Sequence, residues 1–211
     1  MHIPAASDTA ALSIQTFEQA LGAALRPSEQ YDVGRWLYVP PVYDEYRYIL
    51  GTRGENPLIC IGINPSTAEP DHLDNTLKSV ERIALYNGYD SFIMFNLYAQ
   101  RATNPDDMEK QLNRTLHVEN MKAFDYILGL YPHDKTPAVW AAWGAIIEKR
   151  SYLFDCVADM ADIGQKHGAR WFTCGKRSKS GHPHHPLYLP KNSGLDSFEP
   201  AAYLRTFLCT R

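Results

Sequence analysis

Hydrophobic residues occur in short blocks that alternate with amphipathic stretches along most of the chain. The blocks with the length of a buried strand are 58–63, 91–97, 138–143 and 170–174. The stretches with apolar residues at helical spacing are 73–86, 115–130 and 145–167. Gly88 and Gly168 follow the first and last of these stretches and predict helix ends there. Short buried strands separated by helices predict a mostly parallel sheet covered by helices on both faces.

One further helix is predicted in the N-terminal part of the chain, before the alternating strands and helices begin. Apolar residues recur at helical spacing between residues 8 and 25, and Ser7 or Asp8 is suited to cap the start. We expect this helix to pack outside the core. Residues 1–37 then form an N-terminal helical extension, and residues 38–211 form a single α/β domain.

The aromatic segment 38–50 predicts an edge strand over residues 46–50. A Pro-Pro pair precedes this strand, and a glycine-containing turn at 51–54 follows it. We therefore expect the edge strand to form a hairpin with the block at 58–63.

The composition is that of a folded globular protein. Of the 211 residues, 45% are hydrophobic and 21% are charged, and no apolar run approaches the ~20 residues that a membrane span needs. Polar residues interrupt the apolar positions near the N-terminus, so we expect no secretory signal and a cytoplasmic location. The four cysteines are scattered without a CxxC pair, which argues against a zinc ribbon, an iron-sulfur cluster or a disulfide framework. We expect no cofactor.

The formal net charge of −3 gives the whole chain no attraction to nucleic acid. One stretch, 166–185, is nevertheless locally basic, with lysines, arginines and histidines and no acid, whereas acids gather between residues 69 and 74. The basic stretch is either a solvated loop or a local surface for nucleic acid.

In parallel sheets, ligands bind beyond the carboxyl ends of the strands. The loops predicted at those ends are 64–72, 96–106, 143–144 and 175–190. In the first loop, Gly62 allows close approach of another backbone, Pro65 fixes the turn, and Asn64 projects an amide that can hold a water or a substrate group. Ser66 and Thr67 either contact the substrate or cap the following helix.

Asp71 and Asp74, just after this loop, are candidate helix caps, metal ligands or bases, with capping the commonest role. In the second loop, Asn96 presents both a donor and an acceptor, which suits recognition of an amide-like base edge. Tyr98 is placed to stack on a base, and Arg101 pairs either with phosphate or with a carboxylate.

The last loop contains three histidines in four residues, His182, His184 and His185. They could ligate a metal together with Asp71 or Asp74, but the intervening proline and the absence of an HxxxH pattern disfavour this, so we expect no metal. A single histidine held before a proline is better suited to donate a hydrogen bond to a developing negative charge. Further candidate substrate-binding residues of this loop are Lys176, Lys179 and Ser180.

From about Tyr46 to Leu189, the chain resembles an uncharacterised bacterial family, the domain of unknown function 1643 family. Four motifs carry this resemblance: Asn-Pro-Ser-Thr-Ala at 64–68, Asn-Leu-Tyr-Ala-Gln-Arg-Ala-Thr at 96–103, Ala-Trp-Gly at 142–144, and Lys-Ser-Gly-His-Pro-His-His-Pro-Leu-Tyr-Leu at 179–189.

The order of Gly-Ile-Asn-Pro, strand-end Asn and His-Pro is also distantly similar to the uracil-DNA glycosylase superfamily. This resemblance implies a three-layer α/β/α fold with a mostly parallel four-stranded central sheet, here preceded by the N-terminal helix and edge strand. It implies that Asn64 positions the attacking water, that Asn96 reads the base, and that His185 stabilises the leaving base, with His182 as the competing choice. Leu187 stands where the superfamily has a serine.

Together these features predict a glycosylase-like enzyme that acts on the N-glycosidic bond of a nucleobase, with nucleic acid or a nucleotide as partner and no membrane. Such a reaction needs an oriented water and a donor to the departing base. A non-catalytic nucleic-acid or nucleotide binding module on the same fold is the first alternative. A metal-dependent hydrolase that uses Asp71, Asp74 and the histidines is the second.

Overall fold

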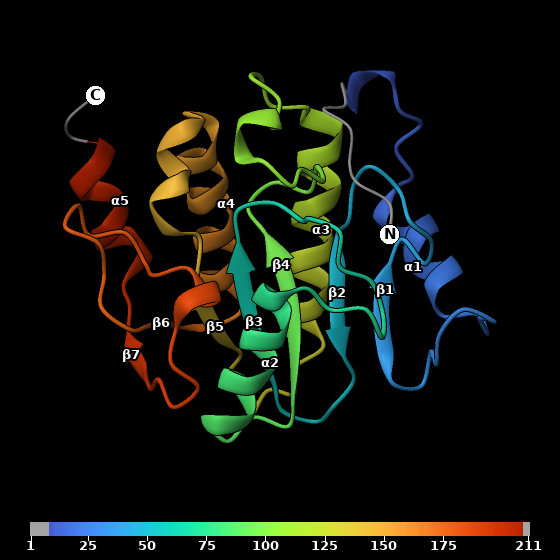
Figure 1. Cartoon of the computed structure of the whole chain (residues 1–211), viewed down its shortest axis with the longest axis horizontal. Helices are drawn as coiled ribbons and strands as arrows, with labels where there is room; N and C mark the ends of the chain where they lie inside the picture. Colours follow the sequence, from blue (N-terminus) through green and yellow to red (C-terminus); the bar gives the residue numbers. More distant parts are fainter. Residues whose placement is uncertain (1–8, 209–211) are drawn as a thin grey trace.

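The computed structural model describes residues 9–208 and contains one seven-stranded sheet with the strand order β1-β2-β4-β3-β5-β6-β7 (Figure 1). The strands are β1 (Trp36–Val39), β2 (Ile49–Thr52), β3 (Pro57–Gly62), β4 (Ser91–Asn96), β5 (Ala138–Ala141), β6 (Arg170–Cys174) and β7 (Leu195–Ser197). The β3–β4, β3–β5 and β5–β6 pairs are parallel, whereas β1–β2, β2–β4 and β6–β7 are antiparallel. The protein therefore has the predicted α/β class, but its sheet is mixed and wider than the four strands expected.

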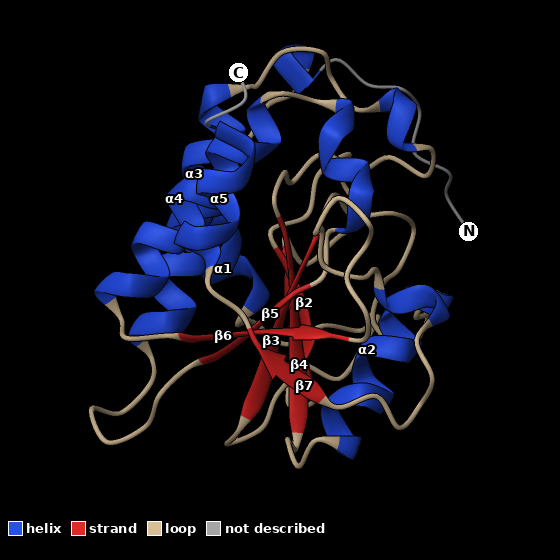
Figure 2. Ribbon diagram, turned by 90° about the vertical axis from the view of Figure 1, so that its left-hand side faces the viewer, coloured by secondary structure: helices blue, strands red, loops and turns tan. Residues whose placement is uncertain are grey.

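Helices cover both faces of this sheet. They are α1 (Phe17–Ala24), α2 (Asn75–Tyr86), α3 (Arg114–Gly129), α4 (Tyr152–Lys166) and α5 (Pro200–Leu208). Figure 2 shows α2 on one side of the sheet and α1, α3, α4 and α5 on the other. Two hydrophobic clusters fill the spaces between these layers.

Side chains of β3 alternate between the two faces of the sheet and contribute to both clusters. Ile59 and Ile61 pack in the cluster on the side of α3 and α4, whereas Leu58 and Cys60 pack in the cluster on the side of α2. Successive side chains of a strand point to opposite faces, so a strand buried on both faces is apolar throughout. This explains why β3 and β4 read as continuous hydrophobic blocks.

The N-terminal helix is shorter than predicted. A 3-10 helix at Thr9–Ala11 is followed by an extended segment, and α1 begins only after Thr16, whose side chain forms a capping box with Gln19. The segment stays extended because the N–H of Gln15 donates to the Tyr46 hydroxyl, and the Tyr48 hydroxyl donates to the Gln15 carbonyl. The predicted caps, Ser7 and Asp8, lie outside the described residues.

The long helix predicted at 145–167 is two helices. A 3-10 helix, Gly144–Lys149, precedes α4, and Arg150 between them has an extended backbone, with φ −138° and ψ 125°. The guanidinium of Arg150 donates hydrogen bonds to the carbonyl oxygens of Asp106 and Met108 at 2.8 and 2.6 Å. These bonds tie the break to the loop after β4, which local periodicity does not encode.

The predicted hairpin is also wrong. β2 pairs with β1 and β4 and not with β3, so the edge strand lies in the interior of this half of the sheet. β2 approaches β4 closely at Gly51, where a Cβ atom would lie 2.4 Å from the carbonyl oxygen of Phe92. The sequence interpretation also missed β1, β7 and α5.

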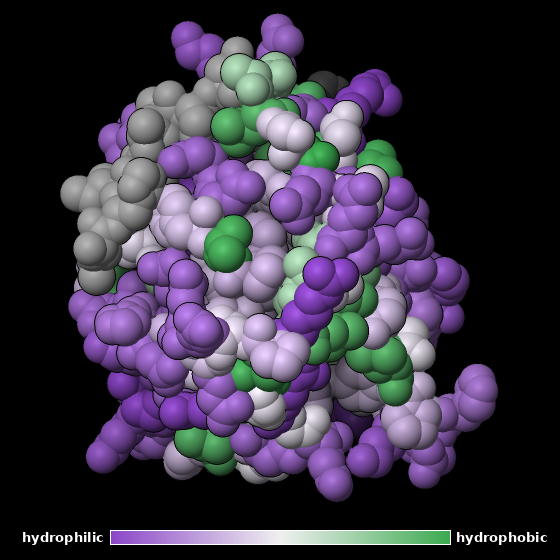
Figure 3. Space-filling model, turned by 90° about the vertical axis from the view of Figure 1, so that its right-hand side faces the viewer, coloured by the Kyte–Doolittle hydropathy of each residue, from purple (hydrophilic) through white to green (hydrophobic). Residues whose placement is uncertain are grey.

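In the part of the chain that the structure describes, no helix has both the length and the apolar character needed to cross a membrane. The face of the molecule seen in Figure 3, on the side of α1 and β1, is mostly hydrophilic where it is not drawn in grey, with hydrophobic side chains in small groups.

Candidate functional site

A cleft with a volume of about 380 Å³ lies at the carboxyl ends of β3 and β4. Both strands run upward in Figure 1, and the loop after β3 crosses above them before it enters α2. The cleft is lined by the polar residues Arg47, Asn64, Ser66, Asp74, Asn75, Thr76, Asn96, Thr103 and His185, together with Gly62, Pro65 and several apolar residues. The loops predicted at 64–72, 96–106 and 175–190 thus contribute to one cavity.

Asn64 is held in one orientation by backbone carbonyls. Its Nδ2 donates hydrogen bonds to the carbonyl oxygens of Pro65 at 3.0 Å and of Ala102 at 2.6 Å. Because both partners can only accept, the amide nitrogen must face them, and Oδ1 is left as the acceptor that the side chain can offer to a ligand. Asn64 therefore presents a hydrogen-bond acceptor at the cleft.

Asn96 ends β4 and is only 1% exposed, yet it lines the cleft. Its buried Nδ2 has no hydrogen-bond partner within residues 9–208. A Cβ atom at Gly62 would lie 2.9 Å from Asn96 Oδ1 and 2.6 Å from Met94 Cε, so glycine allows the Asn96 amide to reach beside β3. The orphaned donor marks a place where an acceptor on a ligand would bind.

His185 caps the 3-10 helix Pro186–Tyr188, and its Nδ1 accepts the N–H of Leu187 at 3.3 Å. In the neutral ring this leaves Nε2 as the protonated nitrogen, so the imidazole can donate from Nε2. Gly144, with φ 66°, lies against His185, and a Cβ there would be 3.4 Å from that of the histidine.

Burial lowers the pKa of His185 below its ordinary value of 6.5, although the charge of Asp74 opposes this shift. A lowered pKa means that the folded protein takes up this proton less readily than the unfolded chain. The contribution of neutral His185 to stability is therefore present above pH 6.5 and is lost as the pH falls through the lower folded value.

We expect the free energy of unfolding of the wild type to fall more steeply than that of His185→Gln between about pH 8 and about pH 5. Urea unfolding of both proteins across this pH range measures the difference between their free energies of unfolding. The other histidines are present in both proteins, so their contributions cancel in this difference. Parallel curves would contradict the lowered pKa.

Asp74 is the N-cap of α2, as its position in the sequence indicated, and its Oδ1 accepts the N–H of Leu77 at 2.9 Å. The same carboxyl group lines the cleft and acts electrostatically on both Arg47 and His185. It is the one carboxylate in the described lining, which gives the cleft a base that Asn64 cannot supply.

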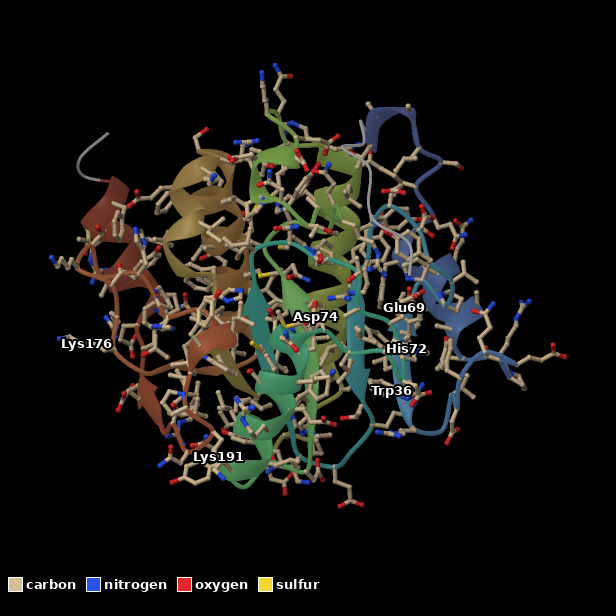
Figure 4. The ribbon with its side chains drawn as sticks, in the orientation of Figure 1. Trp36, Glu69, His72, Asp74, Lys176 and Lys191 are labelled. Carbon is tan, nitrogen blue, oxygen red and sulfur yellow. The ribbon has the colours of Figure 1, made fainter. Side chains whose placement is uncertain are left out.

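Asp71 lies elsewhere. It has a left-handed backbone, with φ 59°, and its Oδ1 accepts the indole N–H of Trp36 at 3.1 Å and lies 3.5 Å from Arg35. Figure 4 shows its partner Trp36 and its chain neighbour His72 to the right of Asp74.

Arg47 is a cleft residue that the sequence interpretation missed. It is 1% exposed, its Nη1 donates to the Ala68 carbonyl at 2.9 Å, and its buried Nε has no partner among the residues that the structure covers. Burial and the neighbouring Arg101 lower the pKa of Arg47 to about 9, so the group keeps its charge at neutral pH. The sequence contained one indication of this residue: an arginine interrupts the otherwise apolar and aromatic segment Tyr46–Leu50, whereas a buried strand is normally apolar.

His182 and Tyr98 lie in the core and not in the cleft. His182 is 0% exposed, with Nδ1 2.8 Å from the Tyr203 hydroxyl and Nε2 2.6 Å from Glu148. Tyr98 is also buried, and its hydroxyl bonds to Glu109. Of the two histidines considered for the leaving base, the cleft contains His185.

Arg101 supports the first loop from beneath. Its guanidinium donates to the carbonyl oxygens of Ser66 and Ala68 and, at 2.9 Å, to the Tyr38 hydroxyl. These acceptors are backbone and phenol oxygens, and within residues 9–208 Arg101 forms no ion pair with a carboxylate. Thr67 is half-buried beside this contact and is outside the described lining.

The basic part of the last loop does not line the described cleft. Lys176, Lys179 and Ser180 are exposed and are not part of its described lining. Figure 4 places Lys176 at the far left of the molecule, whereas Asp74 lies near its centre. These residues and the cleft do not form one local surface.

The three clustered histidines point to different partners. His184 Nδ1 donates to the His185 carbonyl at 2.8 Å, while His182 contacts Glu148 and His185 lines the cleft. Within residues 9–208, no group of three or more histidine, cysteine, aspartate or glutamate side chains could hold a metal ion.

A family model described as "Protein of unknown function (DUF1643)" matches residues 47–187, more than half of the chain. The matched segment begins at Arg47 and includes all the cleft residues named above. No curated protein and no solved structure matches the chain. The chain therefore belongs to the DUF1643 family of proteins of unknown function.

Proposed function

We propose that the cleft is the active site of a glycosylase-like enzyme, which hydrolyses the N-glycosidic bond of a nucleobase in nucleic acid or in a nucleotide. The observation that carries this proposal is the lining of one cleft by Asn64, Asn96, His185 and Asp74. These residues come from three separate segments of the chain, and each brings a different function that the reaction needs.

In the proposed reaction, Asn64 Oδ1 orients a water molecule towards the anomeric carbon of the sugar. Asp74 takes a proton from this water as its oxygen bonds to the carbon and the bond to the base breaks. The bonding electrons leave with the base as an anion, to which His185 donates a hydrogen bond from Nε2. The orphaned Nδ2 of Asn96 donates to an oxygen or nitrogen acceptor on the base.

The arrangement of strands supports the same proposal. The adjacent strands β4, β3, β5 and β6 are mutually parallel and lie between helical layers, which is the arrangement that the resemblance to the uracil-DNA glycosylase superfamily implies. We include this relationship in the proposal, because a shared fold alone does not establish an activity.

The test is base release from purified protein, measured by mass spectrometry. The substrates are single- and double-stranded DNA with normal, deaminated and modified bases, and nucleoside monophosphates. We expect Asn64→Ala to lower release by about 10²-fold or more, because the water loses its orienting acceptor. Asn192→Ala, which removes an exposed amide outside the described lining, is the matched control.

Release that is equal in wild type and Asn64→Ala would show that Asn64 does not have this role. A second candidate, a nucleotide- or nucleic-acid-binding module without catalysis, is favoured by Leu187, which places an apolar side chain in the cleft where the superfamily has a hydroxyl. Binding of these substrates without base release from any of them would support this second candidate against the first.

A further inference from the structure

Two arginines are buried side by side at the cleft without a directly contacting carboxylate, although the charges of Asp74 and Glu69 act on Arg47 from further away. Arg47 and Arg101 are 1% and 0% exposed, and in the described chain neither forms an ion pair. Arg101 has three oxygen acceptors and lies over the Tyr43 ring, with 4.4 Å between its Cζ and the ring centroid. Arg47 has one acceptor, the Ala68 carbonyl.

The two arginines therefore differ in how many of their N–H groups have a hydrogen-bond acceptor. Among the described residues, neither Nε atom has a hydrogen-bond partner, and of the two arginines Arg47 alone is in the described lining of the cleft. A buried cation is costly unless it is paired and hydrogen-bonded, and an arginine fork matches the oxygens of a phosphate. Arg47 therefore brings a buried charge with an unsatisfied N–H group to the wall of the cavity in which the proposed chemistry takes place.

The strand order puts the backbones of Arg47 and His185 on opposite sides of the cleft. Arg47 precedes β2 and its N–H bonds to the Ala99 carbonyl, whereas His185 lies against Gly144, just after β5. β2 and β5 are separated by β4 and β3, so three strand spacings, or about 14 Å, lie between them. One end of a ligand would meet Arg47 and the other end His185, with Asn64 and Asn96 between them.

We propose that Arg47 forms a subsite for a terminal phosphate group, and that the substrate is a free nucleoside monophosphate rather than a polymer. This inference rests on the proposed function in that it places the base at His185. The phosphate occupies the buried end of the cleft. An internal phosphodiester carries chain on both sides and needs an open groove, whereas a terminal monoester needs space on one side only, so the burial of Arg47 favours the monoester.

Isothermal titration calorimetry tests this subsite with AMP, GMP, CMP, UMP and dTMP against the corresponding nucleosides. We expect at least one monophosphate to bind about tenfold or more tightly than its nucleoside, through a charge-assisted arginine pair. Arg47→Met should abolish this difference, and Arg47→Lys should retain part of it. Arg114→Met, at the exposed first residue of α3, is the matched control and should retain all of it.

Thermal unfolding shows whether Arg47→Met is folded, and Arg47→Lys keeps the charge if it is not. Equal binding of monophosphates and nucleosides, or a difference that persists in folded Arg47→Met, would overturn the inference. Tighter binding of a single-stranded oligonucleotide than of every monophosphate would also overturn it. Arg47-dependent monophosphate binding without base release would refute only the glycosylase proposal, and base release that is independent of Arg47 would refute only the subsite.

Discussion

Asp74→Asn is expected to lower the rate of base release by roughly 10²- to 10⁴-fold, because the cleft loses the base that accepts the proton from water. The same change should alter the free energy of unfolding by less than about 0.5 kcal/mol. Asparagine and aspartate are comparable N-caps, so the amide oxygen of the substituted side chain replaces the carboxylate oxygen that accepts the N–H of Leu77. Mass spectrometry of released base and urea unfolding measure the two effects.

Asp74→Ala separates the structural and chemical functions of this carboxyl group. It removes the cap and the base together, so we expect the same loss of activity plus a stability loss of about 1 kcal/mol. If Asp74→Asn kept full activity while Asp74→Ala lost it, the carboxylate would act only through the position of α2.

Gly51→Ala is expected to have the largest effect on stability, a loss of about 3 kcal/mol or more. The added Cβ would lie 2.4 Å from the Phe92 carbonyl oxygen and 2.8 Å from Ile93 Cα. These are backbone atoms of β4 and cannot move aside like the end of a flexible side chain. β2 must separate from β4, and Arg47, two residues before β2, moves with it, so monophosphate binding should weaken as well.

Gly22→Ala is the matched control for the conformational effect of glycine. Gly22 is in α1 and is exposed, and a Cβ there would have no atom within 4 Å. Alanine should therefore stabilise the protein by about 0.5 to 1 kcal/mol, since it favours the helix. Urea unfolding compares both variants with the wild type, and a loss below about 1 kcal/mol for Gly51→Ala would contradict the close packing of β2 on β4.

The hydrophobic pattern was sufficient to predict most of the central elements. β3, β4, β5 and β6 and helices α2 and α3 lie close to the predicted blocks, because burial on one or both faces imposes a period that is visible in the sequence. Where one residue makes long-range hydrogen bonds, the periodicity fails. Gln15 and Arg150 each interrupt a predicted helix, since their partners lie far away along the chain.

Chain-order motifs were likewise sufficient to bring Asn64, Asn96 and His185 into consideration, and the structure places all three in one cleft. The sequence did not show that His182 lies in the core, because three neighbouring histidines look alike until their hydrogen-bond partners are known. Arg47 was missed for the opposite reason. An arginine in a strand gives no sign of whether it faces solvent or a buried cavity.

Local pattern and motifs in the sequence were enough to establish the α/β class, the central strands, the family and the loops that contribute to the cleft. The folded chain was needed to establish the width and mixed pairing of the sheet. It was also needed to show that Asp74 and Arg47 line the same cleft as the predicted residues, and that Lys176 does not. These features depend on which residues, far apart in the sequence, are buried next to one another in the folded protein. Whether a buried polar or charged group finds a hydrogen-bond partner or an opposite charge is decided by the whole folded chain and not by any one segment.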